Sequence, residues 1–240
     1  MNRSYRVIYA GSTSYIVIII CSVPQGSVLG PLLFILYAAD LPDLAKKREI
    51  STHSFADDSQ LYRHGLPVAA AAMVSSVGEC VADMSRWMSS HRLKLNPDKT
   101  EFMWIGTPNS LSKLPSCDLH LHLELESCVI PASREARSLG VIIDAELGMK
   151  QQVHAISRAC FFQLRQLISI RRPVDTGAAS TLVHAFVSSR LDHCNSLLAG
   201  TPKVVTDVLQ NVQNAAARLL TGYSRRQHGI HQLMRENYIG

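Results

Sequence analysis

Apolar positions follow one spacing in the first part of this 240-residue chain and another in the second. Before about residue 148, short β-rich runs are separated by turn residues. Beyond it, apolar residues recur in steps of three and four. The first pattern predicts strands with a few packed helices, and the second predicts helices alone. We therefore expect a protein of the α+β class that ends in an all-helical region.

The β-rich runs begin near the N-terminus. Residues 5–9 and 15–20 predict a hairpin with a loop of about five residues. The second arm does not alternate between apolar and polar positions, so we expect it to be buried on both faces. Helices are expected over residues 31–39, where Pro31 suits the first helical position, and over residues 68–91.

Further strands are expected over residues 101–105, 118–126, 129–130 and 137–144. The run 118–126 alternates leucines with His and Glu, which indicates a strand with one face exposed. Four residues near it suggest a zinc site: Cys117, His120, His122 and Cys128. Their spacing matches no common zinc module, so we interpret the two histidines as residues of the exposed face.

The helical region opens with one apolar stripe, made of Met149, Val153, Ile156, Cys160, Leu164 and Leu167. Pro173 is expected to end this helix, and Asp175 or Thr176 to cap the next one. A third helix is expected over residues 203–220, ended by Gly222.

Charge divides the chain at the same place as the periodicity. Residues 1–147 carry 13 Lys and Arg against 15 Asp and Glu, whereas residues 148–240 carry 11 against 4. The basic part suggests an anionic partner, and nucleic acid is the leading candidate because its phosphates attract Lys and Arg. A basic domain without such a partner is the alternative. Arg158, Arg165 and Arg172 are spaced by seven, so they would share one helix face, either against a phosphate backbone or simply in solvent.

Cysteine usage and apolar length bear on where the protein resides. The six cysteines form no CxxC pair, which favours reduced thiols in an intracellular protein, nuclear or cytoplasmic. Residues 15–23 are apolar but far shorter than a membrane span. Arg3 and Arg6 precede them, as in a secretory signal, yet no small-residue cleavage site follows and Pro24 comes next. We therefore expect neither a membrane partner nor export.

Two adjacent aspartates are the strongest chemical feature. Residues 50–56 and 60–63 predict the arms of a hairpin, with Asp57 and Asp58 followed by Ser59 at its tip. Paired carboxylates suit Mg²⁺, and two such ions could activate a 3′-hydroxyl and stabilise a leaving pyrophosphate. The alternative is a solvated turn, which the dipeptide alone would favour because Asp is common in turns.

Two other positions have a chemical and a structural interpretation. Gln25 and Gly26 precede the first predicted helix, where a glycine lets a nucleotide approach the backbone; a plain strand-to-helix turn is the alternative. Lys99 lies in a predicted turn, where its cation would either clamp a leaving pyrophosphate or remain solvated.

The order of these segments resembles a known family. Residues 22–34 (SVPQGSVLGPLLF) resemble the Pro-Gln-Gly motif of non-LTR (LINE-type) retrotransposon reverse transcriptases, and Phe55-Ala56-Asp57-Asp58 resembles their FADD box about thirty residues later. Residues 95–101 and 138–141 resemble the next two motifs. In the helical region, residues 189–198 and 212–220 are similar to the family's thumb.

This resemblance implies a fold and a reaction. The expected fold is a partial polymerase palm over residues 1–147, an antiparallel sheet with packed helices. An all-helical thumb would follow over 148–223, with a tail over 224–240. The implied activity is RNA-directed DNA polymerisation by a two-metal mechanism with Mg²⁺. The implied partners are deoxynucleoside triphosphates, an RNA template and a DNA primer, or an RNA–DNA hybrid that the basic thumb would hold by its backbone.

The resemblance also implies a role for each matched residue. Asp57 and Asp58 would be the catalytic, metal-binding carboxylates, with Lys99 near the triphosphate. The remaining matched positions would face the nucleotide, the template pair or the primer end: Pro24, Gln25, Gly26, Phe55 and Ala56.

The chain departs from the family pattern in one respect. The family has a third catalytic carboxylate and a fingers region upstream of the Pro-Gln-Gly loop, and only 23 residues precede Pro24. We therefore expect a truncated reverse transcriptase that is inactive alone and needs an upstream segment. The alternatives are a non-catalytic nucleic-acid-binding remnant that uses residues 148–240, or a translated genomic fossil without function.

Overall fold

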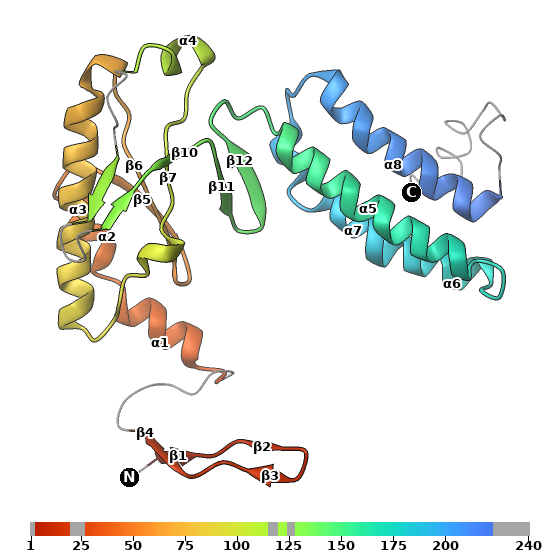
Figure 1. The fold of residues 1–240 in the computed structure, drawn as a ribbon, viewed down its shortest axis with the longest axis horizontal. Helices are drawn as coiled ribbons and strands as arrows, with labels where there is room; N and C mark the ends of the chain where they lie inside the picture. Colours follow the sequence, from red (N-terminus) through yellow and green to blue (C-terminus); the bar gives the residue numbers. More distant parts are fainter. Residues whose placement is uncertain (1–2, 20–26, 115–119, 124–127, 223–240) are drawn as a thin grey trace. The chain divides into compact units, whose positions relative to one another are not determined.

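The computed structural model describes residues 3–19, 27–114, 120–123 and 128–222 (Figure 1). The chain divides into two compact units, Met1–Pro97 with Leu121–Val129, and Asp98–His120 with Ile130–Gly240. Helices and small sheets are mixed along it, which agrees with the expected α+β class.

The N-terminal strands form a hairpin, as predicted. β1 (Arg3–Tyr5) pairs antiparallel with β4 (Val17–Ile19), and β2 (Ile8–Tyr9) pairs with β3 (Ser12–Thr13). Ala10 and Gly11 close it at positive φ, 47° and 81°, so the turn has two residues rather than five. The expected burial of the second arm is wrong, since Tyr15 is 86% exposed and its neighbours are exposed too. An apolar run is buried only where another layer covers it, and in the described sheet β1 is the sole strand paired with β4.

The core of the first unit lies between two helices and the hairpin that separates them in sequence. α1 (Gly30–Tyr37) starts with Pro31 in its first turn, as predicted, and α2 (Leu41–Lys46) follows. β5 (Ser51–Phe55) and β6 (Asp58–Tyr62) pair antiparallel. α3 (Ala70–Ser90), entered through a 3-10 turn at Pro67–Ala69, packs against α2 and β8. The buried side chains of this core are Leu41, Ala45, Ile50, Cys80 and Met84.

An ion-pair network ties α3 to the chain after α2. The guanidinium of Arg48 donates hydrogen bonds to the carboxylates of Asp83 and Glu79, and Arg86 donates a further one to Asp83. The segment Pro67–Ser90 is long and apolar enough, by length and composition alone, to cross a membrane. Its apolar stripe instead faces the core of this unit, and the charged residues lie along the same helix.

Small sheets lie around the start of the second unit. β7 (Phe102–Met103) pairs parallel with β10 (Ala132–Ser133), and the short helix α4 (Pro108–Leu111) follows β7. Of the predicted strand 118–126, the structure describes His120 and β8 (Leu121–Leu123), which pairs with β9 (Cys128–Ile130); Cys117 lies outside the described residues.

The predicted single strand over residues 137–144 is wrong. β11 (Glu135–Ser138) turns back into β12 (Val141–Asp144) through Leu139 and Gly140. Both turn residues have positive φ, 47° and 86°, which is the two-residue turn whose twist suits a hairpin. The run Leu-Gly-Val-Ile-Ile looks continuous in sequence because its first turn residue is a leucine rather than Asn or Asp.

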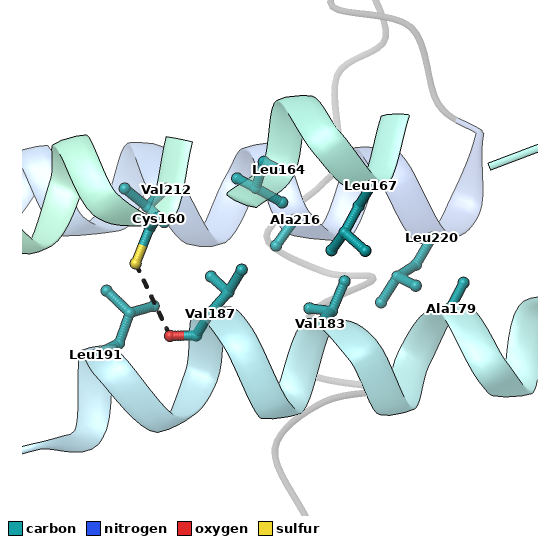
Figure 2. Packing of buried hydrophobic residues seen from close by; sticks show 10 residues of the cluster. All are labelled: Cys160, Leu164, Leu167, Ala179, Val183, Val187, Leu191, Val212, Ala216 and Leu220. Atoms are coloured by element: carbon teal, nitrogen blue, oxygen red, sulfur yellow. Dashed lines mark hydrogen bonds between the residues drawn. The ribbon is translucent and has the colours of Figure 1, made fainter. Parts of the chain in front are cut away.

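Within the described residues, four α-helices build the rest of the second unit: α5 (Lys150–Ile170), α6 (Thr176–Val183), α7 (Ser189–Asp192) and α8 (Lys203–Thr221). Figure 2 shows their shared core, where side chains of α5 and α8 meet those of the α6–α7 segment. The stripe predicted on α5 is confirmed, with Val153, Cys160, Leu164 and Leu167 buried. The thiol of Cys160 donates to the carbonyl of Val187 at 3.9 Å, and burial raises the pKa of this thiol.

The segment between α6 and α7 is a π-helix, His184–Ser188. Buried residues of this long helix come four apart, at Ala179, Val183, Val187 and Leu191. In an α-helix of 3.6 residues per turn, each step of four rotates the side chain about 40° past its predecessor. A wider turn with i→i+5 hydrogen bonding removes that drift, so the four side chains stay on one face.

The predicted helix ends are confirmed. The Asp175 carboxylate accepts a hydrogen bond from the Ala178 amide at 2.9 Å and caps α6. Gly222, at φ 73°, ends α8. Arg171 ties these ends together, because its guanidinium donates to the carbonyls of Val174 and Leu219 at 2.7 and 3.2 Å.

Candidate active site and nucleic-acid interface

The two aspartates lie at the end of the β5–β6 hairpin. The register pairs Phe55 with Asp58, so Ala56 and Asp57 form the turn and Asp58 begins β6. The predicted hairpin is confirmed, but its tip is Ala56–Asp57 and Ser59 lies within the strand. Ala56 has φ 53°, a conformation that costs an L-residue energy and fixes where the next two side chains leave the backbone.

One face of this hairpin is anchored and the other is open. Leu61 packs against the core of the first unit, and the hydroxyls of Ser54 and Ser59 lie 3.2 Å apart on the same face. Side chains alternate along a strand, so Phe55 and Asp58 project from the opposite face, where both are exposed. The core therefore holds the hairpin while leaving its end accessible.

Both carboxylates are exposed and without a partner among the described residues. Neither Asp57 nor Asp58 accepts a hydrogen bond or joins an ion pair there, whereas Asp83 in the same unit receives two guanidiniums. Hard carboxylate oxygens are the ligands that Mg²⁺ prefers, so this pair fits such an ion chemically. The described residues bring no third His, Cys, Asp or Glu to it. Further ligands must then come from water, a substrate or another segment.

The other predicted nucleotide contacts remain predictions. Pro24, Gln25 and Gly26 lie outside the described residues. Lys99 is exposed at the end of a 3-10 turn, Pro97–Lys99, and belongs to the second unit, whereas the aspartates belong to the first. Phe55 and Ala56 are exposed beside the carboxylates.

The predicted row of arginines is correct for two of its three members. Arg158 and Arg165 lie on the exposed face of α5, and neither has a hydrogen-bond or ion-pair partner in the part of the chain that the structure describes. Arg172 is exposed too, but it lies in the turn after α5, which ends at Ile170. Pro173 explains this difference, since the residue before a proline is disfavoured in helical conformation.

The sequence interpretation missed one residue of this face. Phe162 is four residues after Arg158 and three before Arg165, and it is 52% exposed. The spacing that aligned the arginines places Phe162 with them and not with the buried stripe. Its neighbour Phe161 packs instead against the core.

Comparison with known proteins identifies relatives for most of the chain. Over 171 residues, 69% of this chain, it is 30% identical to a protein of Drosophila melanogaster described as probable RNA-directed DNA polymerase from transposon BS. It is 26% identical to the probable RNA-directed DNA polymerase from transposon X-element over 206 residues, and 25% identical to the RNA-directed DNA polymerase from mobile element jockey over 163 residues, both of the same fly. These alignments cover 83% and 66% of this chain.

The aligned part is a small share of each relative. The matches span 18%, 22% and 17% of the lengths of the transposon BS, X-element and jockey proteins. No solved structure matches the chain. The reverse transcriptase (RNA-dependent DNA polymerase) family matches residues 2–143, which contain the β5–β6 hairpin and its two aspartates. Since that match covers more than half of the 240 residues, the chain belongs to the reverse transcriptase family.

Proposed function

We propose that this chain is the palm-and-thumb portion of an RNA-directed DNA polymerase of a non-LTR retrotransposon. One observation carries the proposal: two adjacent carboxylates without partners among the described residues lie at a hairpin turn inside the segment that matches the family. The relatives support the class, because their descriptions name RNA-directed DNA polymerases of transposons and mobile elements.

Each residue of the site has its own role in nucleotidyl transfer. Asp57 and Asp58 hold Mg²⁺, which when bound activates a primer 3′-hydroxyl and stabilises the leaving pyrophosphate. Phe55 and Ala56 line the primer end beside the carboxylates. Gln25 and Gly26 face the nucleotide and its template base, and Lys99 neutralises charge on the triphosphate. The arginines of the helical region hold the template–primer duplex by its phosphates.

A second part of the proposal concerns the chain by itself. Asp57 and Asp58 are two ligands of a site whose chemistry needs further metal ligands, and the described residues add no third carboxylate. We therefore expect the isolated 240-residue chain to give no primer extension. A segment supplying a further carboxylate would complete the site.

A chimaera tests the polymerase class. Residues 2–143 of this chain replace the corresponding segment of the Drosophila melanogaster jockey polymerase, and primer extension is measured on an RNA template with Mg²⁺ and four deoxynucleoside triphosphates. We expect extension that the change Asp57→Asn with Asp58→Asn abolishes. Asp43→Asn, which alters an exposed carboxylate of α2, is the matched control and should leave extension intact.

Two results would count against these proposals. A chimaera that unfolds cooperatively and binds the hybrid but does not extend the primer would contradict the polymerase class. Extension by the isolated chain, lost on changing Asp57 and Asp58, would contradict only its inactivity.

Arg158 and Arg165, which have no hydrogen-bond or ion-pair partner among the described residues, favour one other function, non-catalytic binding of nucleic acid. Its distinguishing result is a salt-dependent affinity of the full 240-residue chain for duplex that survives Asp57→Asn with Asp58→Asn, together with a chimaera that does not extend a primer.

A further inference from the structure

The outward face of α5 has a composition unlike that of the other long helices. In steps of three and four it presents Gln151, His154, Arg158, Phe162, Arg165 and Ser169, all of them exposed. α5 contains no Asp or Glu in its 21 residues, whereas α3 carries Glu79 and Asp83 and α8 carries Asp207. This face therefore offers cationic and neutral polar groups around the phenyl ring of Phe162.

The core of the second unit does not use this face. The opposite side of α5 buries Val153, Cys160, Leu164 and Leu167 against α6 and α8 (Figure 2). Phe161 completes that packing, while Phe162 keeps half of its surface in solvent. Folding alone thus requires a large apolar side chain at 161 but not at 162.

The two guanidiniums beside Phe162 are available to a ligand. Arg171, at the end of the same region, is committed to the carbonyls of Val174, Leu219 and Leu220. Arg158 and Arg165 make no hydrogen bond or ion pair within the described residues. A partner with negative charge and a flat apolar surface would complement both the two cations and the ring.

An unpaired nucleotide strand supplies both features at the required spacing. Arg158 and Arg165 lie about 6 Å and about 4.5 Å along the helix axis from Phe162, on either side of it. Phosphates can meet the guanidiniums while a base lies on the ring between them. In a duplex the base faces are hidden in the stack, so a ring on a convex helix surface reaches them only in a single strand.

We propose that the outward face of α5 binds single-stranded nucleic acid, with Phe162 stacked on one base and Arg158 and Arg165 on flanking phosphates. This binding does not depend on Asp57 or Asp58, and a single strand would use the same two arginines that the proposed function assigns to the duplex. The binding also differs from backbone tracking of a duplex, which would need the arginines but not the ring.

Fluorescence anisotropy with the full 240-residue chain tests the proposal. The probes are labelled 12-nucleotide oligouridine, 12-nucleotide oligothymidine and a blunt duplex of the same length. We expect Phe162→Ala to weaken binding of the single strands by about 5- to 150-fold, which is the range for one stacked base, and to change duplex binding little. Phe162→Trp should retain single-strand affinity.

Two further variants separate stacking from charge and from surface hydrophobicity. Arg158→Gln with Arg165→Gln should lower affinity and flatten the slope of log affinity against log salt by about 1.4 for single strands. Ile168→Ala removes an apolar side chain of the same helix that is 61% exposed but off this face, and it should change nothing.

The proposal is overturned if Phe162→Ala binds single strands as tightly as Ile168→Ala does, or if it weakens duplex and single strands equally. Far-UV circular dichroism and thermal unfolding show whether each variant is folded. If Phe162→Ala does not fold, the affinity of Phe162→Trp for single strands still decides the test. A loss confined to oligouridine or to oligothymidine supports the proposal and identifies the strand.

Discussion

Arg48 connects the chain after α2 to the middle of α3 through Asp83, a carboxylate that it shares with Arg86. The hydrogen bond from Arg48 lowers the pKa of Asp83, outweighing a desolvation that acts in the opposite direction. A carboxyl group whose pKa is lowered by folding stabilises the folded state above its unfolded pKa of about 3.9. That contribution is lost as the pH falls through the lower, folded pKa.

We predict that Asp83→Asn removes part of the acid sensitivity of the first unit. The variant should be less stable than the parent at pH 7, by up to about 1 kcal/mol because the pairs are partly exposed. The difference should shrink below about pH 4, as Asp83 becomes protonated in the parent. Urea unfolding from pH 7 to pH 2 measures it, and Glu79→Gln, at the more exposed partner of Arg48, should have the smaller effect. A constant difference across this pH range would contradict the prediction.

Individual residues show which parts of the candidate site could be predicted from the sequence and which could not. The hairpin that carries Asp57 and Asp58 followed from local pattern, but only the resemblance to the family's FADD box favoured metal binding over a solvated turn. Arg172 was wrongly placed on the helix because the seven-residue spacing was continued up to the residue before Pro173. A residue before proline is disfavoured in helical conformation, and α5 ends at Ile170. Phe162 was missed because it is the same residue type as its neighbour Phe161. The two differ in their exposure to solvent, since Phe161 packs against the core and Phe162 does not.

At the scale of elements, the β11–β12 hairpin combines a well-suited turn residue with a poorly suited one. Both Leu139 and Gly140 have positive φ, which glycine adopts freely and leucine does not. A Cβ added at Gly140 would approach Nε2 of His193 at 3.7 Å, an ordinary contact. Backbone strain therefore decides the effect of a substitution at either position.

We predict opposite effects at these neighbouring positions. Leu139→Asn should stabilise the protein by about 0.5–1 kcal/mol, because Asn tolerates left-handed conformation and Asn-Gly is the preferred pair in this turn. Gly140→Ala should destabilise it by about 1–2 kcal/mol. Chemical denaturation measures both, and a loss of stability in Leu139→Asn would contradict the interpretation of the turn.

Some elements are determined by residues close to them in sequence, and others depend on what packs against them. The α5 stripe and the caps at Asp175 and Gly222 follow from periodicity and from hydrogen-bond chemistry within a few residues, and sequence was sufficient for them. The burial expected for residues 15–20 was wrong because it depends on which layer covers a strand. The β11–β12 turn was missed because a leucine occupies its first position.

At the scale of the whole molecule, each of the two units carries one of the chain's two tryptophans. Trp87 lies in α3 of the first unit, stacked on His91 with ring centroids 3.9 Å apart, and Trp104 lies in the second unit against Phe102. Fluorescence of Trp87→Phe therefore reports the second unit, and fluorescence of Trp104→Phe reports the first.

We predict that a cavity in one core leaves the other unit unchanged. Leu164→Ala should destabilise the second unit by about 2–5 kcal/mol, because Leu164 is fully buried between α5 and its neighbours. In the Trp87→Phe background the fluorescence transition should move to lower denaturant, and in the Trp104→Phe background it should stay in place. Transitions that move together in both backgrounds would show a single cooperative fold.

The π-helical segment His184–Ser188 has a consequence for how this protein tolerates change. Its wider turn keeps Ala179, Val183, Val187 and Leu191 in line although they are spaced four residues apart. His184, Ala185 and Phe186 are exposed and free to vary. Removing one residue would restore an ordinary helix with these side chains four, three and four residues apart, and they would still share one face because eleven residues rotate by only about 20° beyond three full turns. We therefore expect this segment to tolerate the loss of one residue without turning the rest of the helix away from the core.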